Sequence, residues 1–212
     1  MLSSSALLIC IDPSVGRVDK HLLPQETLME LLIEEMEFKD IIKGIHDDPK
    51  PISSWPGVRI GSYGEVLTID WHQRELDGST DLKWLPVSLE SLDLLGNDLH
   101  GTLDLTDLPH RLCGLILSAN CFDGSVDLTQ LPSSLRTLRL DRNKLSGTIN
   151  VTRLPQAMKN LWLGTNAFEG STDFSQVPKS LVMLDVTCTN LSGEIPKGVK
   201  AYVNMSNVKS MT

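Results

Sequence analysis

Between residues 66 and 203, apolar residues recur along the chain with a period of 23 residues. When each unit is numbered from its first apolar residue, positions 1, 4, 6 and 11 are apolar, position 9 is asparagine and position 13 is glycine. Position 1 is occupied by Leu89, Leu112, Leu135, Met158 and Leu181. An earlier unit begins at Val66 and has Arg74 in place of the asparagine, and the unit that begins at Leu181 has Thr189 there. A period of this length predicts a solenoid, in which each coil buries its apolar side against its neighbours.

The spacing within one unit predicts the role of each position. Positions 4 and 6 have the two-residue period of a β-strand, so they point into the core, while positions 3, 5 and 7 point outward. The asparagine at position 9 turns the chain out of the strand, and its amide is expected to bond backbone groups of neighbouring coils that would otherwise be buried unpaired. These ladder asparagines are Asn97, Asn120, Asn143 and Asn166.

The motif L-x-x-L-x-L-x-x-N-x-L resembles that of the leucine-rich-repeat family. The resemblance implies an α/β horseshoe-shaped solenoid with a parallel β-sheet on its concave face. The glycine at position 13 and the segment 190–196 (NLSGEIP) are similar to the plant-type subclass, whereas the Leu-Pro at positions 20 and 21 departs from it. Two N-terminal segments, 8–19 and 27–35, also resemble the start of trypanosomatid leucine-rich-repeat proteins.

The ends of the chain do not follow the repeat. Residues 1–65 are predicted to form an N-terminal cap with one helix over about 25–45, where the apolar spacing is helical. The order of helix, Trp55, Gly57-Val58 and first strand is similar to the cap of plant-type repeat proteins, but Arg59 stands where those caps usually have a cysteine. The solenoid is predicted over 66–203, with six repeats and a partial seventh that has Tyr202 at inward position 4 and Asn207 at position 9. Residues 204–212 are expected to be a tail.

Acidic residues recur at position 16 and leave two interpretations open. One is a carboxylate ladder that binds calcium. The other is that each side chain caps a short helical turn that runs to the proline at position 21, and the sequence favours this one. The position-16 residues are Asp81, Asp104, Asp127, Asn150 and Asp173.

Charge and motifs exclude several functions. A net charge of −8 argues against a nucleic-acid surface. The sequence lacks the G-x-S-x-G, H-E-x-x-H, Walker and G-x-G-x-x-G motifs, and its five histidines have no partner spacing. Its four cysteines form no C-x-x-C pair. We therefore expect no enzyme, catalytic residue, metal site or cofactor.

The outward positions predict a binding surface on the concave face. Trp162 stands at position 5 beside several cations, and tryptophan and arginine are enriched in binding hot spots. We expect a scaffold that holds a protein or peptide with acidic and apolar groups, and that is a monomer or an oligomer formed through its edge. The predicted binding residues are Arg136, Arg139, Arg142, Lys159, Trp162 and Ile116.

The expected compartment depends on weak signals. The apolar run 6–11 is short and no basic residue precedes Arg17, so no signal peptide is expected. No stretch approaches the ~20 apolar residues of a membrane span. Unpaired cysteines favour the cytoplasm. Sequons at Asn150, Asn190 and Asn204 favour the alternative, a secreted or cell-surface recognition module of leucine-rich-repeat type.

Overall fold

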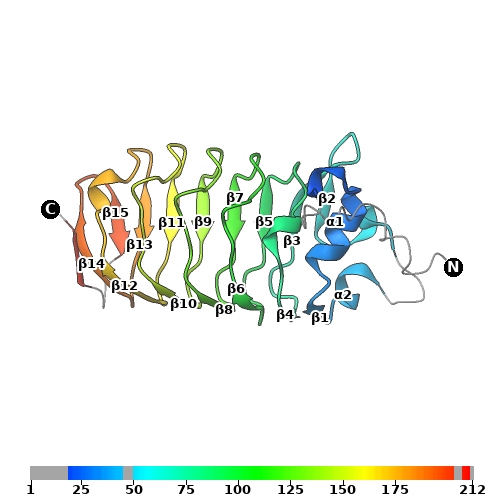
Figure 1. Cartoon of the computed structure of the whole chain (residues 1–212), viewed down its shortest axis with the longest axis horizontal. Helices are drawn as coiled ribbons and strands as arrows, with labels where there is room; N and C mark the ends of the chain where they lie inside the picture. The colour runs from blue at the N-terminus through cyan, green and yellow to red at the C-terminus, as the bar shows by residue number, and fades with distance from the viewer. Residues whose placement is uncertain (1–18, 45–49, 203–206, 211–212) are drawn as a thin grey trace, which may run out of the picture.

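The computed structural model describes residues 19–44, 50–202 and 207–210. Coils follow one another along the long axis of the molecule, with the helices at the N-terminal end and the last coil at the other end (Figure 1). This is the solenoid that the 23-residue period predicts, with the arrangement that the resemblance to the leucine-rich-repeat family implies. Within the described residues, two parallel sheets run along the solenoid, and a pair of short antiparallel strands joins its first coil to the N-terminal segment.

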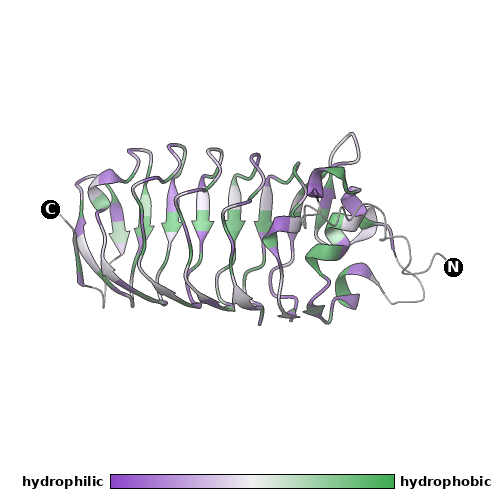
Figure 2. Ribbon diagram, in the orientation of Figure 1, coloured by the Kyte–Doolittle hydropathy of each residue, from purple (hydrophilic) through white to green (hydrophobic). Residues whose placement is uncertain are grey.

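The larger sheet is formed by the strands at positions 3 to 5 of each coil. Its eight described strands are hydrogen-bonded in the order β15-β13-β11-β9-β7-β5-β3-β2, and all pair in parallel except β2 with β3. Figure 2 shows hydrophobic residues recurring at a similar level in successive strands of this sheet. The strands are β2 (Val58–Ile60), β3 (Val66–Asp70), β5 (Ser91–Asp93), β7 (Gly114–Ile116), β9 (Thr137–Arg139), β11 (Asn160–Trp162), β13 (Met183–Asp185) and β15 (Lys200–Tyr202).

A second parallel sheet, which the sequence did not predict, is formed by positions 10 to 14. Its glycines at position 13 have positive φ, and at Gly124 (φ +74°) a Cβ would lie 3.0 Å from the Thr102 side chain. The strands are β6 (His100–Thr102), β8 (Cys121–Gly124), β10 (Lys144–Gly147), β12 (Ala167–Ser171), β14 (Asn190–Ile195) and β16 (Asn207–Ser210), the last inside the expected tail. Two 3₁₀ turns, η3 (Leu82–Trp84) and η4 (Phe174–Gln176), lie outside both sheets.

The core is the column of apolar residues between the two sheets. The side chains at positions 1, 4, 6 and 11 are almost fully buried in every coil, as for Leu135, Leu138, Leu140 and Leu145, each with 0% exposure. At position 11, Phe122 and Phe168 replace leucine and are equally buried. The inward alternation predicted from the sequence is therefore confirmed.

The predicted continuous helix over 25–45 is wrong. The chain forms 3₁₀ turn η1 (Lys20–Leu22), helix α1 (Gln25–Leu32), strand β1 (Met36–Glu37) and helix α2 (Asp40–Lys43), and residue 45 lies outside the described residues. The helix ends because β1 pairs antiparallel with β4 (Asp77–Gly78) of the first coil. This pairing buries Met36 and uses backbone groups that the first coil would otherwise leave unbonded.

Two tryptophans join the N-terminal segment to the first coil. Trp55 follows the 3₁₀ turn η2 (Ile52–Ser54), and its ring lies 6.4 Å from that of Trp71 on the first coil. The indole N–H of Trp71 donates to the Pro56 carbonyl at 3.0 Å. Gly57 must be glycine, because with φ +82° a Cβ would lie 1.9 Å from the Asp70 carbonyl oxygen. The boundary between cap and solenoid at residue 65 stays a prediction.

The seventh, partial repeat is one residue out of the predicted register. Strand β15 pairs with β13 so that Ala201 lies opposite inward Leu184 and Tyr202 lies opposite Asp185. Tyr202 is thus at outward position 5 and not at inward position 4, because the small Ala201 takes the inward place. Asn207 pairs with Ser192 in the second sheet, so it does not occupy position 9. Asn204 lies outside the described residues.

Candidate functional site

The outward side chains of the eight-stranded sheet form the face on which the sequence predicts binding, and we call it the concave face. In-register strand pairing aligns its position-5 side chains into one row along the solenoid. The row begins acidic and ends cationic and aromatic. From the first coil to the last it consists of Asp70, Asp93, Ile116, Arg139, Trp162, Asp185 and Tyr202.

Three members of this row form a stacked group, which we call the Trp162 patch: Arg139, Trp162 and Tyr202. The Arg139 guanidinium carbon lies 4.8 Å from the centre of the Trp162 ring, within the range of a cation–π interaction. On the other side, the Tyr202 ring lies 6.1 Å from that of Trp162 with an interplanar angle of 30°. Tyr202 is 41% exposed. The sequence did not assign Tyr202 to the site, because its register placed this residue inward.

A buried carboxylate, that of Asp141, forms an ion pair with Arg139. Asp141 accepts from Arg139 Nε at 3.4 Å and from the Ser118 hydroxyl at 2.5 Å, and its side chain is only 8% exposed. Part of the charge of Arg139 is therefore compensated within the protein. We infer that Arg139 offers a flat stacked surface as much as a free charge.

Asp185 is nearly buried, although it stands in the row of outward position-5 side chains. It lies in register between Trp162 and Tyr202 but is only 8% exposed, and its carboxylate accepts from the Thr187 N–H at 2.9 Å. This carboxylate is therefore engaged within the protein and adds little exposed negative charge between Trp162 and Tyr202.

The remaining predicted residues flank the patch. Ile116 lies opposite Arg139 on the adjacent strand and is half-buried. Arg136 and Lys159 precede neighbouring strands β9 and β11, and Arg142 follows β9; all three are exposed. The binding role of the six residues stays a prediction.

The ladder asparagines bond across coils, as their position suggests. The Asn97 amide donates to the carbonyls of Trp71 and Leu94 at 2.9 Å each, and it accepts from the Leu76 N–H at 3.1 Å. Asn166 makes the equivalent bonds to Leu140, Leu163 and Leu145. Asn120 and Asn143, in the coils between Asn97 and Asn166, each form the same kind of bonds. These bonds fix the end of each strand and so the spacing of the outward side chains.

At position 16 the capping hydrogen bond is present in each of the first five coils, and a 3₁₀ helix follows it at Asp81 and Asp173, whereas a non-helical turn follows in the other three. Each side chain accepts from the N–H two residues later, as Asp104 does from Thr106 at 2.9 Å and Asn150 does from Thr152 at 3.0 Å. Side-chain and backbone hydrogen bonds from Thr106, Thr129 and Ser175 lower the pKa values of Asp104, Asp127 and Asp173, respectively. These carboxylates are engaged locally and do not converge on a common point.

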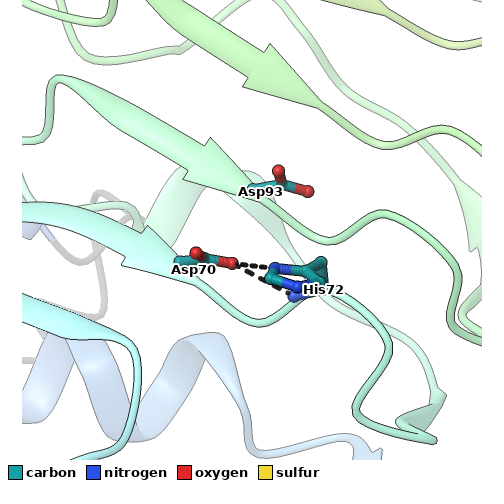
Figure 3. Close-up of side chains that lie close together, drawn as sticks. All are labelled: Asp70, His72 and Asp93. Carbon is teal, nitrogen blue, oxygen red and sulfur yellow. Dashed lines mark hydrogen bonds and ion pairs between the residues drawn. The ribbon is translucent and has the colours of Figure 1, made fainter.

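A different set of side chains converges at the acidic end of the concave face. The described ranges contain one group of three or more histidine, cysteine or acidic ligand atoms that lie within 4.8 Å of one another: Asp70, His72 and Asp93. Figure 3 shows His72 turned toward Asp70, with Asp93 beside them on the next strand. His72 Nδ1 lies 2.5 Å from Asp70 Oδ1. Sequence spacing did not reveal this group, because it forms across two coils.

A cleft of about 480 Å³ lies between α1 and η3, away from the concave face. There the Lys83 ammonium lies 4.7 Å from the centre of the Trp84 ring and forms an ion pair with Asp81. This cation–π pair has the same chemistry as Arg139 and Trp162 but lies outside the eight-stranded sheet, so it offers a matched control for the Trp162 patch.

Comparison with known proteins gives matches only at the level of structure. No family model and no curated protein sequence matches the chain. Among solved structures, Pollen Receptor Kinase 3 is 23% identical with a TM-score of 0.63, over 86% of this chain and 95% of its own. The BIR2 ectodomain from Arabidopsis thaliana is 20% identical with a TM-score of 0.58, over 89% and 94%.

A third similar structure is that of a complex. The Arabidopsis receptor kinase HAESA, in complex with the peptide hormone IDA and the co-receptor SERK1, is 24% identical with a TM-score of 0.53; the match spans 88% of this chain and 42% of HAESA. These likenesses show the fold. None of the helices within the described ranges has the length and apolar character needed to cross a membrane.

Proposed function

Because this chain has the leucine-rich-repeat fold, we propose that it is a recognition module that binds a peptide or a small protein domain on its concave face. The observation that supports this most is the Trp162 patch: aromatic side chains remain partly exposed on a sheet whose inward side chains are buried. An exposed aromatic group of this kind is the type of surface that supplies contact area in binding hot spots.

The patch and its flanks favour a particular partner chemistry. The Trp162 and Tyr202 rings offer apolar area, while Arg136, Arg142 and Lys159 are exposed cations around them. The guanidinium groups can hold a carboxylate through two hydrogen bonds. The preferred partner therefore presents an acidic residue beside an aromatic or aliphatic one. This role is binding, not catalysis.

We place this recognition outside the cell, in preference to the cytoplasmic scaffold expected from the cysteines. Two of the similar structures, BIR2 and HAESA, are described as an ectodomain and as a receptor kinase bound to a peptide hormone. Asn150 and Asn190, in two of the three sequons, are exposed and can accept glycans. The resemblance to trypanosomatid proteins has no counterpart among these structures.

Capture experiments test both parts of the proposal. The immobilised protein is exposed separately to extracellular medium and to cytosol from the source cells, and retained proteins are identified by mass spectrometry. We expect a partner from the medium that the wild type retains and the double variant Trp162→Ala/Tyr202→Ala does not. Equal retention by the two proteins would contradict the concave site, and retention from cytosol alone would contradict the extracellular setting.

A further inference from the structure

We propose that Asp70, His72 and Asp93 bind a divalent transition-metal ion such as Zn²⁺ at the acidic end of the concave face. The proposal is independent of the recognition function. It rests on one imidazole and two carboxylates whose ligand atoms all lie within 4.8 Å of one another (Figure 3). An imidazole with carboxylates is a common ligand set for zinc.

The backbone holds these three residues in fixed relative positions. Asp70 ends β3 and Asp93 ends β5, and the two residues are directly paired in the parallel sheet. His72 follows Asp70 by two residues, so its ring returns over the same strand end. The Leu95 N–H donates to Asp93 Oδ1 at 2.9 Å. This bond orients the carboxylate and leaves its Oδ2 atom to bind the metal. Metal binding therefore needs only side-chain rotation.

The charges of the group also point to a cation. Two carboxylates directly opposite each other on adjacent strands repel. Within the described residues, Asp70 has one ion pair, with His72, and Asp93 has none within 4.0 Å. Among the described residues, the imidazole of His72 is thus the one side chain within 4.0 Å of either carboxylate that can carry a positive charge. A divalent cation among the three ligands neutralises both carboxylates, which a proton on the imidazole does not.

The ligand types favour a transition metal over calcium. Ca²⁺ takes six to eight oxygen ligands, far more than two aspartates supply, whereas an imidazole nitrogen suits Zn²⁺, Ni²⁺ or Cu²⁺. With metal–ligand bonds of about 2.1 Å, ligand atoms around tetrahedral zinc are about 3.4 Å apart. The 2.5 Å between His72 Nδ1 and Asp70 Oδ1 must therefore open by about 1 Å. Water fills the remaining coordination position, since the group lies at the surface.

Calorimetric titration of the metal-free full chain with Zn²⁺ tests the proposal. Because the cysteine thiols can also bind zinc, the measured quantity is the number of ions that depends on the group. We expect His72→Ala and Asp93→Asn each to lose one bound Zn²⁺ per chain or to weaken its binding at least tenfold, with unchanged circular dichroism. Ca²⁺ should not compete at equal concentration.

His100→Ala is the matched control. It removes an exposed imidazole that lies 4.0 Å from the carboxylate of Asp77, and it leaves the proposed ligands intact. We expect this variant to bind zinc as the wild type does. The proposal is overturned if His72→Ala keeps the full zinc stoichiometry and affinity, if His100→Ala loses as much as His72→Ala, or if Ca²⁺ displaces Zn²⁺, because the last result would mean general attraction to acidic surface.

Discussion

At the scale of single residues, position in the repeat decides whether a side chain serves packing or recognition. Leu138 and Arg139 are neighbours in sequence, yet the first is fully buried and the second is stacked on Trp162 at the surface. The two-residue period of the strand separates them. The same rule applied one residue out of register placed Tyr202 inward, because the sequence pattern indicates a shortened last repeat but does not fix how many residues it lacks.

A buried hydroxyl without a hydrogen-bond partner gives a prediction with an unusual sign. Thr172 is 4% exposed, and its hydroxyl has no hydrogen-bond partner among the described residues. The equivalent positions of the preceding coils hold Val126 and Ile149. Thr172→Val should therefore raise the free energy of unfolding by about 1 kcal/mol, since an unpaired buried hydroxyl costs about that much.

Chemical denaturation measures this change. Leu138→Ala calibrates the assay, because emptying a buried leucine site should lower the free energy of unfolding by about 2–5 kcal/mol. A loss of stability in Thr172→Val would mean that the hydroxyl is satisfied in solution and that the burial argument fails for this coil.

At the scale of elements, the strands that line the concave face follow directly from the sequence, whereas those outside the repeat depend on tertiary pairing. The apolar residues at positions 4 and 6 predict β3, β5, β7, β9, β11 and β13. The second sheet was not predicted because glycine at position 13 reads as a turn and not as a strand. The helix over 25–45 was overestimated because the apolar residues near Met36 fit a helix, while the open edge at β4 offers hydrogen bonds that a sequence pattern does not reveal.

The aspartates that follow the strands of the second sheet, at position 16, predict a pH dependence of stability. Hydrogen bonds lower the pKa values of Asp104, Asp127 and Asp173 from the usual value of 3.8. The folded state therefore binds fewer protons than the unfolded state just below this value. Their contribution to stability is complete above about pH 4 and is lost as the pH falls through the lowered pKa values.

Replacement of these three aspartates by asparagine should remove this dependence. Asn150 shows that the amide makes the same cap, since it accepts from both the N–H and the hydroxyl of Thr152. Denaturation curves should show that the triple variant loses less stability than the wild type between about pH 5 and about pH 2.5. An equal loss in both proteins would assign acid sensitivity to other carboxylates.

At the scale of the whole molecule, stacking of coils converts a local sequence pattern into a graded surface. The position-5 row runs from two aspartates at one end to Arg139, Trp162 and Tyr202 at the other. The net charge of −8 conceals this separation, because it averages over both ends. The repeat alone was enough to predict that the basic residues at 136, 139, 142 and 159 lie close together. It was not enough to predict the group of Asp70, His72 and Asp93, because the position of His72 depends on the turn after β3.

The most direct test of the recognition account is isothermal titration of a captured partner with two single variants. Trp162→Ala should weaken binding about 30-fold or more, equivalent to about 2 kcal/mol, because it removes the centre of the stacked patch. Lys83→Ala, which removes the cation of the similar pair with Trp84 outside the sheet, should leave the affinity unchanged. If Lys83→Ala weakens binding and Trp162→Ala does not, the partner binds away from the concave face and the account is wrong.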